Sequence, residues 1–218
     1  MPVSEAEYAA QRARMVEKQL ERRHIHDARV LAAMRAVPRH LFVPEYFREL
    51  AHADSPAPIG YEQTISQPFI VAYMLQQLKL TGEEKILEIG AGSGYQTALL
   101  AQLCRKVYAF EIISPLAAQA AALMEALKIA NVKIHCGDGY WGWPEAAPFD
   151  RIIIAAAPGH VPQNLVAQLR EGGRMILPLG VFNQRLLLLR KSAAGKISRR
   201  KLAPVKFVPM TGLAEKVN

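Results

Sequence analysis

The chain has 218 residues, of which 51% are hydrophobic, and a formal net charge of +8 at pH 7. This length and apolar content favour a folded globular domain and exclude a disordered or fibrous chain. The longest apolar runs, residues 152–158 and 186–189, are too short to span a bilayer, and the first residues carry no signal-peptide pattern. We therefore expect a cytoplasmic protein without membrane contact.

The positive charge is spread along the chain rather than gathered in one segment. Basic pairs such as Arg22-Arg23 alternate with acidic residues, and no basic tail is present, so we expect no nucleic-acid partner. Cys104 and Cys136 lie in apolar segments, and neither the cysteines nor the six histidines show a metal-ligand spacing. We expect two buried, reduced thiols, no metal and a monomeric protein.

The first sixty residues have the pattern of a helical extension. Residues 4–7 read Ser-Glu-Ala-Glu, a capping box that predicts a helix running toward Arg22. A second helix is expected over 27–37, and Pro44 opens a short third one. Residues 52–60 are rich in proline and small polar residues, which predicts a loop.

From residue 85 onward, short apolar runs alternate with helical patterns. A helix is also expected from Pro68 through Leu78. Strands are expected over 85–89, 106–110, 132–136, 151–155 and 174–179, helices over 95–103, 115–129 and 162–170, and closing strands over 184–190, 196–201 and 205–208. This alternation predicts an α/β fold with a Rossmann-like, doubly wound sheet. We expect one domain over 1–218, with a helical extension over 1–60 and the α/β core over 61–218.

A glycine-rich turn follows the first of these strands. Glu88 closes the strand, and Gly90, Gly92 and Gly94 come at every second position, where glycine lets the backbone approach a ligand. A dinucleotide fingerprint would need its third glycine at position 95, which is Tyr95. The spacing instead favours S-adenosylmethionine (AdoMet), as in methyltransferases. The alternative is a tight turn without a ligand.

Two further acids fall where the next strands end. Glu111 comes about twenty residues after the glycine turn, the distance at which an acid in this fold accepts hydrogen bonds from both ribose hydroxyls. Asp138 lies between Gly137 and Gly139 and is placed to accept from an adenine amine. For Glu111 the alternative is an exposed glutamate that caps a helix, and for Asp138 the alternative is a simple turn.

A second group of polar residues precedes the helix expected at Pro68. Thr64 and Ser66 lie just ahead of its amino terminus, where free N–H groups favour an anion. Such a place suits a carboxylate that faces a methyl donor, with Ser66 Oγ as an orienting donor. The alternative is that Ser66 is a plain N-cap residue.

Nearly the whole chain resembles the protein-L-isoaspartate (D-aspartate) O-methyltransferases. The Thr-Ile-Ser-x-Pro element is the most specific carrier of this resemblance, since most AdoMet methyltransferases share the glycine turn. The chain departs from relatives at Phe69, where animal members have histidine, and at Ala155, where threonine is frequent. The segments that carry the resemblance are residues 59–68, 87–97, 137–139, 147–150, 162–174 and 207–210.

The resemblance implies a class I AdoMet-dependent methyltransferase fold and assigns roles to particular residues. Ser66 would be the catalytic residue, with isoaspartyl proteins and peptides as substrates. AdoMet would be the cofactor and S-adenosyl-L-homocysteine the product. The residues implied to bind the cofactor are Thr64, Ile65, Glu88, Gly90, Gly92, Ser93, Gly94, Glu111, Ile112, Asp138, Gly139 and Thr211.

The reaction implied is a protein repair step. A methyl group passes from AdoMet to the free α-carboxyl of an L-isoaspartyl residue, and the ester leads through a succinimide to aspartate. Two alternatives stay open at this point. One is a methyltransferase for a small molecule or RNA, which would not need the Thr-Ile-Ser-x-Pro element, and the other is a non-catalytic AdoMet-binding or partner-binding domain.

Overall fold

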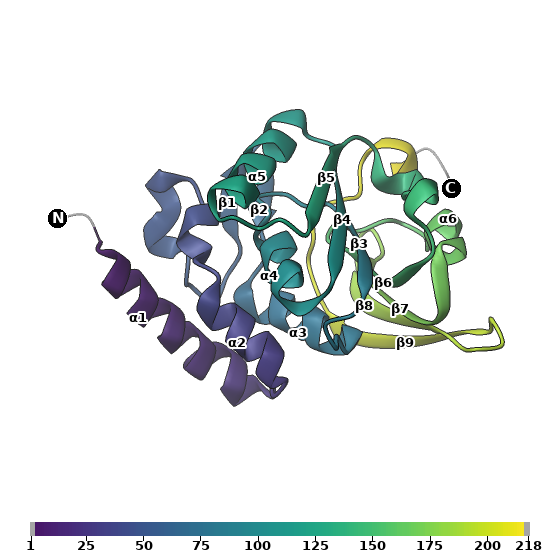
Figure 1. The fold of residues 1–218 in the computed structure, drawn as a ribbon, viewed down its shortest axis with the longest axis horizontal. Helices are drawn as coiled ribbons and strands as arrows, with labels where there is room; N and C mark the ends of the chain where they lie inside the picture. Colours follow the sequence, from purple (N-terminus) through teal and green to yellow (C-terminus); the bar gives the residue numbers. More distant parts are fainter. Residues whose placement is uncertain (1–2, 216–218) are drawn as a thin grey trace.

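The computed structural model describes residues 3–215 and has one large sheet at its centre (Figure 1). The strands are β1 (Ala57–Gly60), β2 (Gln63–Ile65), β3 (Lys85–Ile89), β4 (Lys106–Glu111), β5 (Val132–Cys136), β6 (Phe149–Ile154), β7 (Leu169–Leu179), β8 (Arg185–Lys191) and β9 (Ile197–Pro204). Seven strands form the large sheet in the order β5-β4-β3-β6-β7-β8-β9, and β1 pairs with β2 separately. Strands β3 to β7 are parallel, whereas β8 and β9 pair antiparallel. The predicted Rossmann-like α/β fold is confirmed.

Helices cover both faces of this sheet. They are α1 (Glu5–Met15), α2 (Ala28–Ala36), α3 (Pro68–Leu78), α4 (Tyr95–Leu103), α5 (Ser114–Ala126) and α6 (Gln163–Ala167). Buried side chains of α2 to α5 form one hydrophobic cluster with one face of the sheet, and α6 packs on the other face. Figure 1 shows α1 and α2 (purple) at the lower left, on the opposite side of the molecule from α6.

The double coverage explains the unbroken apolar runs of the strands. In β6, Ile153 packs on the side of α3 and α4, while its neighbours Ile152 and Ile154 belong to the cluster on the opposite face. All three side chains are buried. A strand with both faces buried reads as a continuous hydrophobic run, which is why β3 and β6 could be located from the sequence.

The strand order fixes where a ligand can bind. Strand β3 lies between β4 and β6, so successive strands continue to opposite sides of β3. This is the topological switch point of a doubly wound sheet, and ligands bind in the crevice at the carboxyl ends of the strands there. The glycine turn follows β3 at this place, and Ala155 follows β6.

The amino-terminal region differs in detail from the expected helices. The capping box is confirmed, since Ser4 Oγ accepts from the Glu7 N–H (3.3 Å) and Glu7 Oε2 accepts from the Ser4 N–H (2.7 Å). The helix then changes to a π-helical turn over Val16–Leu20 and a 3₁₀ turn over Glu21–Arg23, which ends at a left-handed His24. The segment after Pro44 is a 3₁₀ helix, and a further 3₁₀ turn spans Arg39–Phe42.

Four other expectations need correction. The predicted loop over 52–60 ends in β1, whose turn into β2 uses positive φ at Gly60, Tyr61 and Glu62. Helix α5 ends at Ala126 because Lys128 has a left-handed backbone (φ 56°). Helix α6 is only five residues long because Leu169 pairs with Phe149 as the first residue of β7.

The fourth is the closing strand expected over 205–208, which is absent from the described residues. Gln184 holds this segment instead, since its side chain accepts from the Phe207 N–H (2.6 Å) and donates to the Phe207 carbonyl (3.0 Å). Ala157 then exchanges two backbone hydrogen bonds with Val208 and Met210. Residues 205–208 thus form no strand, and the only β-pairing of the segment among the described residues is a single parallel bridge between Ala157 and Pro209, which places residues 208–211 beside the carboxyl end of β6.

The amino-terminal helices share one hydrophobic cluster with the α/β region. Met15, Leu20 and Met34 belong to the same cluster as Leu99 and Ile153. The expectation of one domain over 1–218 stays a prediction, which this shared cluster supports. None of the helices within residues 3–215 has the length and apolar character needed to cross a membrane.

The two cysteines differ in burial. Cys104 is buried, as expected, but Cys136 is exposed. The expectation of two buried thiols is wrong for Cys136 because this residue ends β5, which is an edge strand of the sheet.

Candidate active site

A cavity opens at the carboxyl ends of β3, β4 and β6. It has about 890 Å³ of empty volume, counted out to its open mouth, and lies at the switch point of the sheet. Eleven of the thirteen site residues predicted from the sequence line it, and only Glu88 and Gly94 do not. The eleven are Thr64, Ile65, Ser66, Gly90, Gly92, Ser93, Glu111, Ile112, Asp138, Gly139 and Thr211.

Glu111 is the acid most directly built into the cavity. Its carboxylate is nearly buried, with Oε2 accepting from the Gly92 N–H (2.7 Å) and Oε1 accepting from the Ile113 N–H (2.9 Å). The second bond supports the start of α5, so the helix-capping interpretation is correct in part, but Glu111 is not the exposed residue that it requires. Because each carboxylate oxygen has two acceptor sites, Glu111 can still accept from hydroxyl groups in the cavity.

Asp138 connects two segments that line the cavity. Its Oδ1 accepts from the Tyr140 N–H (2.9 Å), as a simple turn would, and its Oδ2 accepts from the Leu213 N–H (2.8 Å). The second bond ties Thr211 and the carboxyl-terminal turn to the end of β5. The neighbouring Gly139 leaves space that no side chain could share, since a Cβ there would come within 2.8 Å of Ile89.

The three glycines of the turn have different positions relative to the cavity. Gly90 and Gly92 line the cavity, whereas Gly94 faces away from it. A Cβ on Gly94 would lie 3.1 Å from Ala120 and 3.2 Å from the Met124 methyl group, and its backbone has φ +85°. Gly94 thus allows α4 to begin close against α5, and it does not line the cavity as the cofactor-binding role predicted.

Glu88 lies behind the cavity and not in its wall. Its side chain is fully buried, and Oε1 accepts from Gln96 Nε2 (2.9 Å). Its Oε2 has no hydrogen-bond partner among the described residues. Burial raises the pKa of Glu88 to about 7, because the charged form loses hydration that its polar neighbours do not replace. Gln96 lines the cavity, so Glu88 acts on its wall indirectly.

Ser66 lies in the short link between β2 and α3. The N-cap of α3 is Gln67, without a side-chain cap bond, so the interpretation of Ser66 as a plain N-cap is wrong. Ser66 is half-buried and lines the cavity together with Thr64 and Ile65. Its carbonyl oxygen accepts from Arg39 Nη2 (2.8 Å). The link therefore presents the serine toward the same space as the glycine turn.

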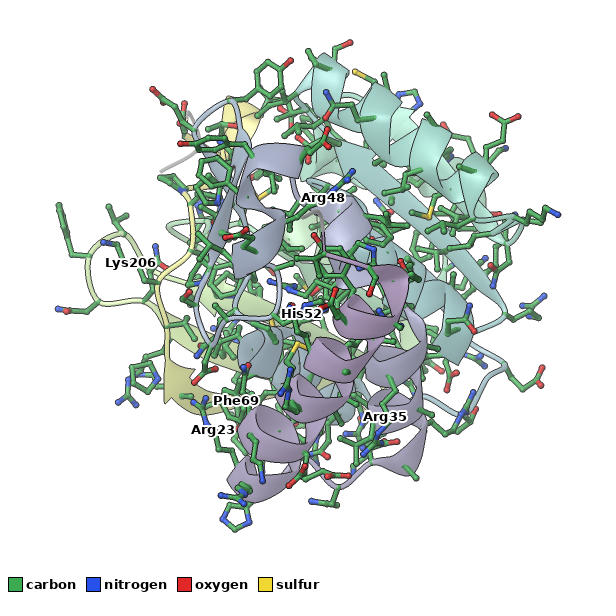
Figure 2. The ribbon with its side chains drawn as sticks, turned by 90° about the vertical axis from the view of Figure 1, so that its left-hand side faces the viewer. Arg23, Arg35, Arg48, His52, Phe69 and Lys206 are labelled. Atoms are coloured by element: carbon green, nitrogen blue, oxygen red, sulfur yellow. The ribbon has the colours of Figure 1, made fainter. Side chains whose placement is uncertain are left out.

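The two positions where the chain departs from relatives lie in different places. Phe69 is outside the cavity, under the guanidinium of Arg23, whose Cζ is 3.6 Å from the ring centroid. Figure 2 shows the two side chains next to each other. Ala155, in contrast, lines the cavity. A substitution at Ala155 thus changes the shape of the cavity directly.

Several lining residues were not predicted. They include Ile59, Tyr95, Gln96, Ala156 and residues 208–210. Their side chains carry no reactive or ionisable group apart from the Tyr95 phenol, so no chemical pattern marks them in the sequence. The segments around Ile59 and residues 208–210 did carry the family resemblance, which was the available signal. Among the described residues, no group of three or more His, Cys, Asp or Glu side chains could hold a metal ion.

Comparison with known proteins identifies the family. A family model described as protein-L-isoaspartate(D-aspartate) O-methyltransferase (PCMT) matches residues 10–215 of the chain. The chain belongs to this family. It is 52% identical to a protein-L-isoaspartate O-methyltransferase from Synechococcus sp. (strain JA-2-3B'a(2-13)), over 93% of this chain and 86% of that protein. A second relative, protein-L-isoaspartate O-methyltransferase 1 from Rhodopseudomonas palustris (strain HaA2), is 50% identical over 97% of this chain and 88% of its own length.

A solved structure of the PCMT family also matches the fold of this chain. A beta-aspartate methyltransferase (PCMT) from Plasmodium falciparum, in complex with S-adenosyl-L-homocysteine, superposes with a TM-score of 0.80 and 27% identity. The match covers 92% of this chain and 98% of that chain. The fold is therefore that of class I methyltransferases, and AdoMet is the cofactor of the family.

The residues of the cavity fit this cofactor. A buried carboxylate, Glu111, is available for ribose hydroxyls at the end of β4. Gly139 leaves room beside Ile89 and Phe110 that a Cβ would fill, and Ile112 offers a partly exposed apolar surface. Flat aromatic bases and apolar chains bind to such surfaces, while few polar groups fix their orientation.

Proposed function

We propose that this chain transfers a methyl group from AdoMet to the free α-carboxyl of L-isoaspartyl residues in damaged proteins and peptides. The following backbone nitrogen then attacks the ester carbonyl and methanol leaves, and water opens the resulting succinimide in part to normal aspartate. One observation carries the proposal beyond family membership. The Thr64-Ile65-Ser66 segment and the glycine turn, which are far apart in the sequence, line the same cavity.

We assign the cofactor to the side of the cavity that the glycine turn forms. Gly90, Gly92 and Ser93 would lie against it, and Glu111 would accept from the ribose hydroxyls. Ile112, Asp138 and Gly139 would surround the adenine, and Thr64, Ile65 and Thr211 would line the space where cofactor and substrate meet. Glu88 and Gly94, which do not line the cavity, would support this side from behind. When bound, AdoMet supplies an electrophilic methyl group on a positively charged sulfur.

The chain's own contribution is orientation and exclusion of water. A carboxylate has a pKa near 4 and is ionised at neutral pH, so no base is needed to activate it. In agreement with this, the described residues that line the cavity include no His, Cys, Lys or Arg. Ser66 Oγ would donate a hydrogen bond to the substrate carboxylate and align it.

Substrate recognition is proposed to depend on the backbone rather than on particular side chains, because isoaspartyl sites arise at many sequences. Residues 63–67 and 205–208 are the segments proposed to contact the peptide. The Gln184 side chain bonds to both the N–H and the carbonyl oxygen of Phe207, which keeps the second segment extended. Monomeric state, cytoplasmic location and the absence of a nucleic-acid partner stay predictions from the sequence.

The repair of a defined peptide tests this function. An L-isoaspartyl peptide incubated with the protein and AdoMet should be converted in part to its L-aspartyl isomer, as followed by reversed-phase chromatography. The control reaction without AdoMet should leave the peptide unchanged, since ring closure expels methanol from the ester and the free carboxylate has no comparable leaving group. Persistence of the isoaspartyl peptide, with neither ester nor succinimide detected, would contradict the proposal.

A further inference from the structure

Arg39 is a fully buried cation that joins three separate parts of the chain. It is 0% exposed and begins the 3₁₀ turn Arg39–Phe42 of the amino-terminal region. Its Nε donates to the Ala51 carbonyl (2.6 Å) and its Nη2 donates to the Ser66 carbonyl (2.8 Å). Its Cζ lies 4.6 Å from the ring centroid of Tyr95. A residue remote from the glycine turn in the sequence thus contacts two residues that line the cavity, Ser66 and Tyr95.

This arginine is unusual because no acid neutralises it. Among the described residues, no Asp or Glu lies within 4.0 Å of its guanidinium, and Nη1 has no hydrogen-bond partner. Burial lowers the pKa of Arg39, since the charged form is removed from water. A buried charge without a counterion costs free energy, so filling space does not explain it. The planar guanidinium does provide what an apolar side chain lacks, two donors in fixed directions.

The contact with Ser66 acts on a link that has few other constraints. Strand β2 ends at Ile65, and α3 begins at Pro68, which has no backbone N–H to donate. Gln67, between them, is held by its side chain, which donates to the Asp54 carbonyl and carboxylate. The bond from Arg39 fixes the direction of the Ser66 carbonyl and hence the peptide plane that follows Ser66. This bond therefore restricts the backbone of Ser66, which lines the cavity.

The same guanidinium also contacts Tyr95, a second residue that lines the cavity. Tyr95 is the first residue of α4, directly after the glycine turn, and it lines the cavity. Its ring packs against Phe42 (centroids 5.5 Å apart), and its Oη donates to Met34 Sδ (3.5 Å). The amino-terminal helices therefore support the cavity through Arg39 and Tyr95 together.

We propose that Arg39 is a positioning residue for methyl transfer, which holds the Ser66 peptide group so that the serine hydroxyl faces the substrate carboxylate. This inference rests on the proposed function, because it assigns Arg39 a part in the same reaction. It makes the amino-terminal helical region a part of the catalytic apparatus. A purely structural role would instead stabilise the fold without acting through Ser66.

A double-mutant cycle separates these two roles. Arg39→Met in the wild-type background should lower kcat for an isoaspartyl peptide about 10-fold or more, because a displaced orienting group costs catalysis. In the Ser66→Ala background, where the hydroxyl is already lost, Arg39→Met should lower kcat by less than about twofold. Chemical denaturation should show the same loss of stability from Arg39→Met in both backgrounds.

Arg12 provides the matched control. It is a second buried arginine of the same region, its Nε donates to the Arg35 carbonyl (2.6 Å), and its Nη1 also has no partner among the described residues. It does not line the cavity. Arg12→Met should lower the unfolding midpoint but leave kcat within about twofold of the wild type, since loss of a buried hydrogen bond acts on stability.

The outcomes distinguish this inference from the function on which it rests. Equal reductions of kcat by Arg39→Met in both backgrounds, or no reduction in either, would overturn the positioning role while the wild type remains active. An inactive wild type would overturn the proposed function itself. If Arg39→Met fails to fold, Arg39→Lys in the same cycle gives the test, because lysine keeps the charge but cannot hold both carbonyls with the same geometry. Its cost in kcat should likewise disappear in the Ser66→Ala background.

Discussion

Replacing Glu111 with Gln should weaken binding of S-adenosyl-L-homocysteine about 100-fold, which corresponds to about 2.7 kcal/mol. Both carboxylate oxygens accept from backbone N–H groups, one of Gly92 and one of Ile113. A glutamine amide has only one acceptor oxygen, so in either orientation its NH₂ group faces a backbone donor. The substitution therefore disturbs the glycine turn and removes an acceptor for ribose hydroxyls at the same time.

Isothermal titration calorimetry with S-adenosyl-L-homocysteine measures this effect. Glu125→Gln is the matched control, since Glu125 is exposed on α5 and does not line the cavity. It should bind as the wild type does. A Kd for Glu111→Gln equal to that of the wild type would show that Glu111 is not part of the cofactor site.

Replacing Glu88 with Gln should stabilise the protein at high pH. Burial raises the pKa of Glu88 to about 7, from an ordinary value of 4.5. Between these values the folded protein holds a proton that the unfolded chain has released, so wild-type stability falls as pH rises through this range. Glutamine is neutral at every pH and can still accept from Gln96. The gain in free energy of unfolding should grow from near zero at pH 4.5 to about 3 kcal/mol above pH 7.

Urea denaturation of both proteins between pH 5 and pH 9 measures this difference. Glu84 gives a contrast of opposite sign. It is also buried, but the Thr81 and Gly82 N–H groups donate to its carboxylate, and its pKa is lowered despite the opposing effect of burial. Glu84→Gln should therefore destabilise the protein at neutral pH. An effect of Glu88→Gln that does not change with pH would show that its carboxyl has an ordinary pKa.

The sequence predicted the parts of the fold that depend on local pattern. Strands β3 and β6 read as apolar runs because both of their faces are buried, and α3 is marked by Pro68 at its start. It did not predict the length of α6 or the state of residues 205–208. Those depend on long-range partners, the pairing of Leu169 with Phe149 and the side chain of Gln184.

In the candidate site, too, local patterns could be predicted from the sequence and long-range contacts could not. Glu111 and the Thr64-Ile65-Ser66 segment were found because their chemistry and spacing are visible in the chain. The positions of Glu88 and Gly94 could not be deduced, since spacing alone does not say whether a residue faces the cavity or the protein interior. Arg39 was missed for a related reason. Its partners Ala51, Ser66 and Tyr95 come together only when the amino-terminal region packs on the sheet.

The most direct test of the proposed function uses two peptides that differ only in one residue, L-isoaspartate or L-aspartate. Each is incubated with the protein and methyl-labelled AdoMet, and base-labile methyl ester is counted. We predict label in the isoaspartyl peptide and none in the aspartyl peptide, because only the first carries the free α-carboxyl on a side branch. Label in neither peptide, while calorimetry still shows cofactor binding, would contradict the account and indicate another methyl acceptor or a binding role.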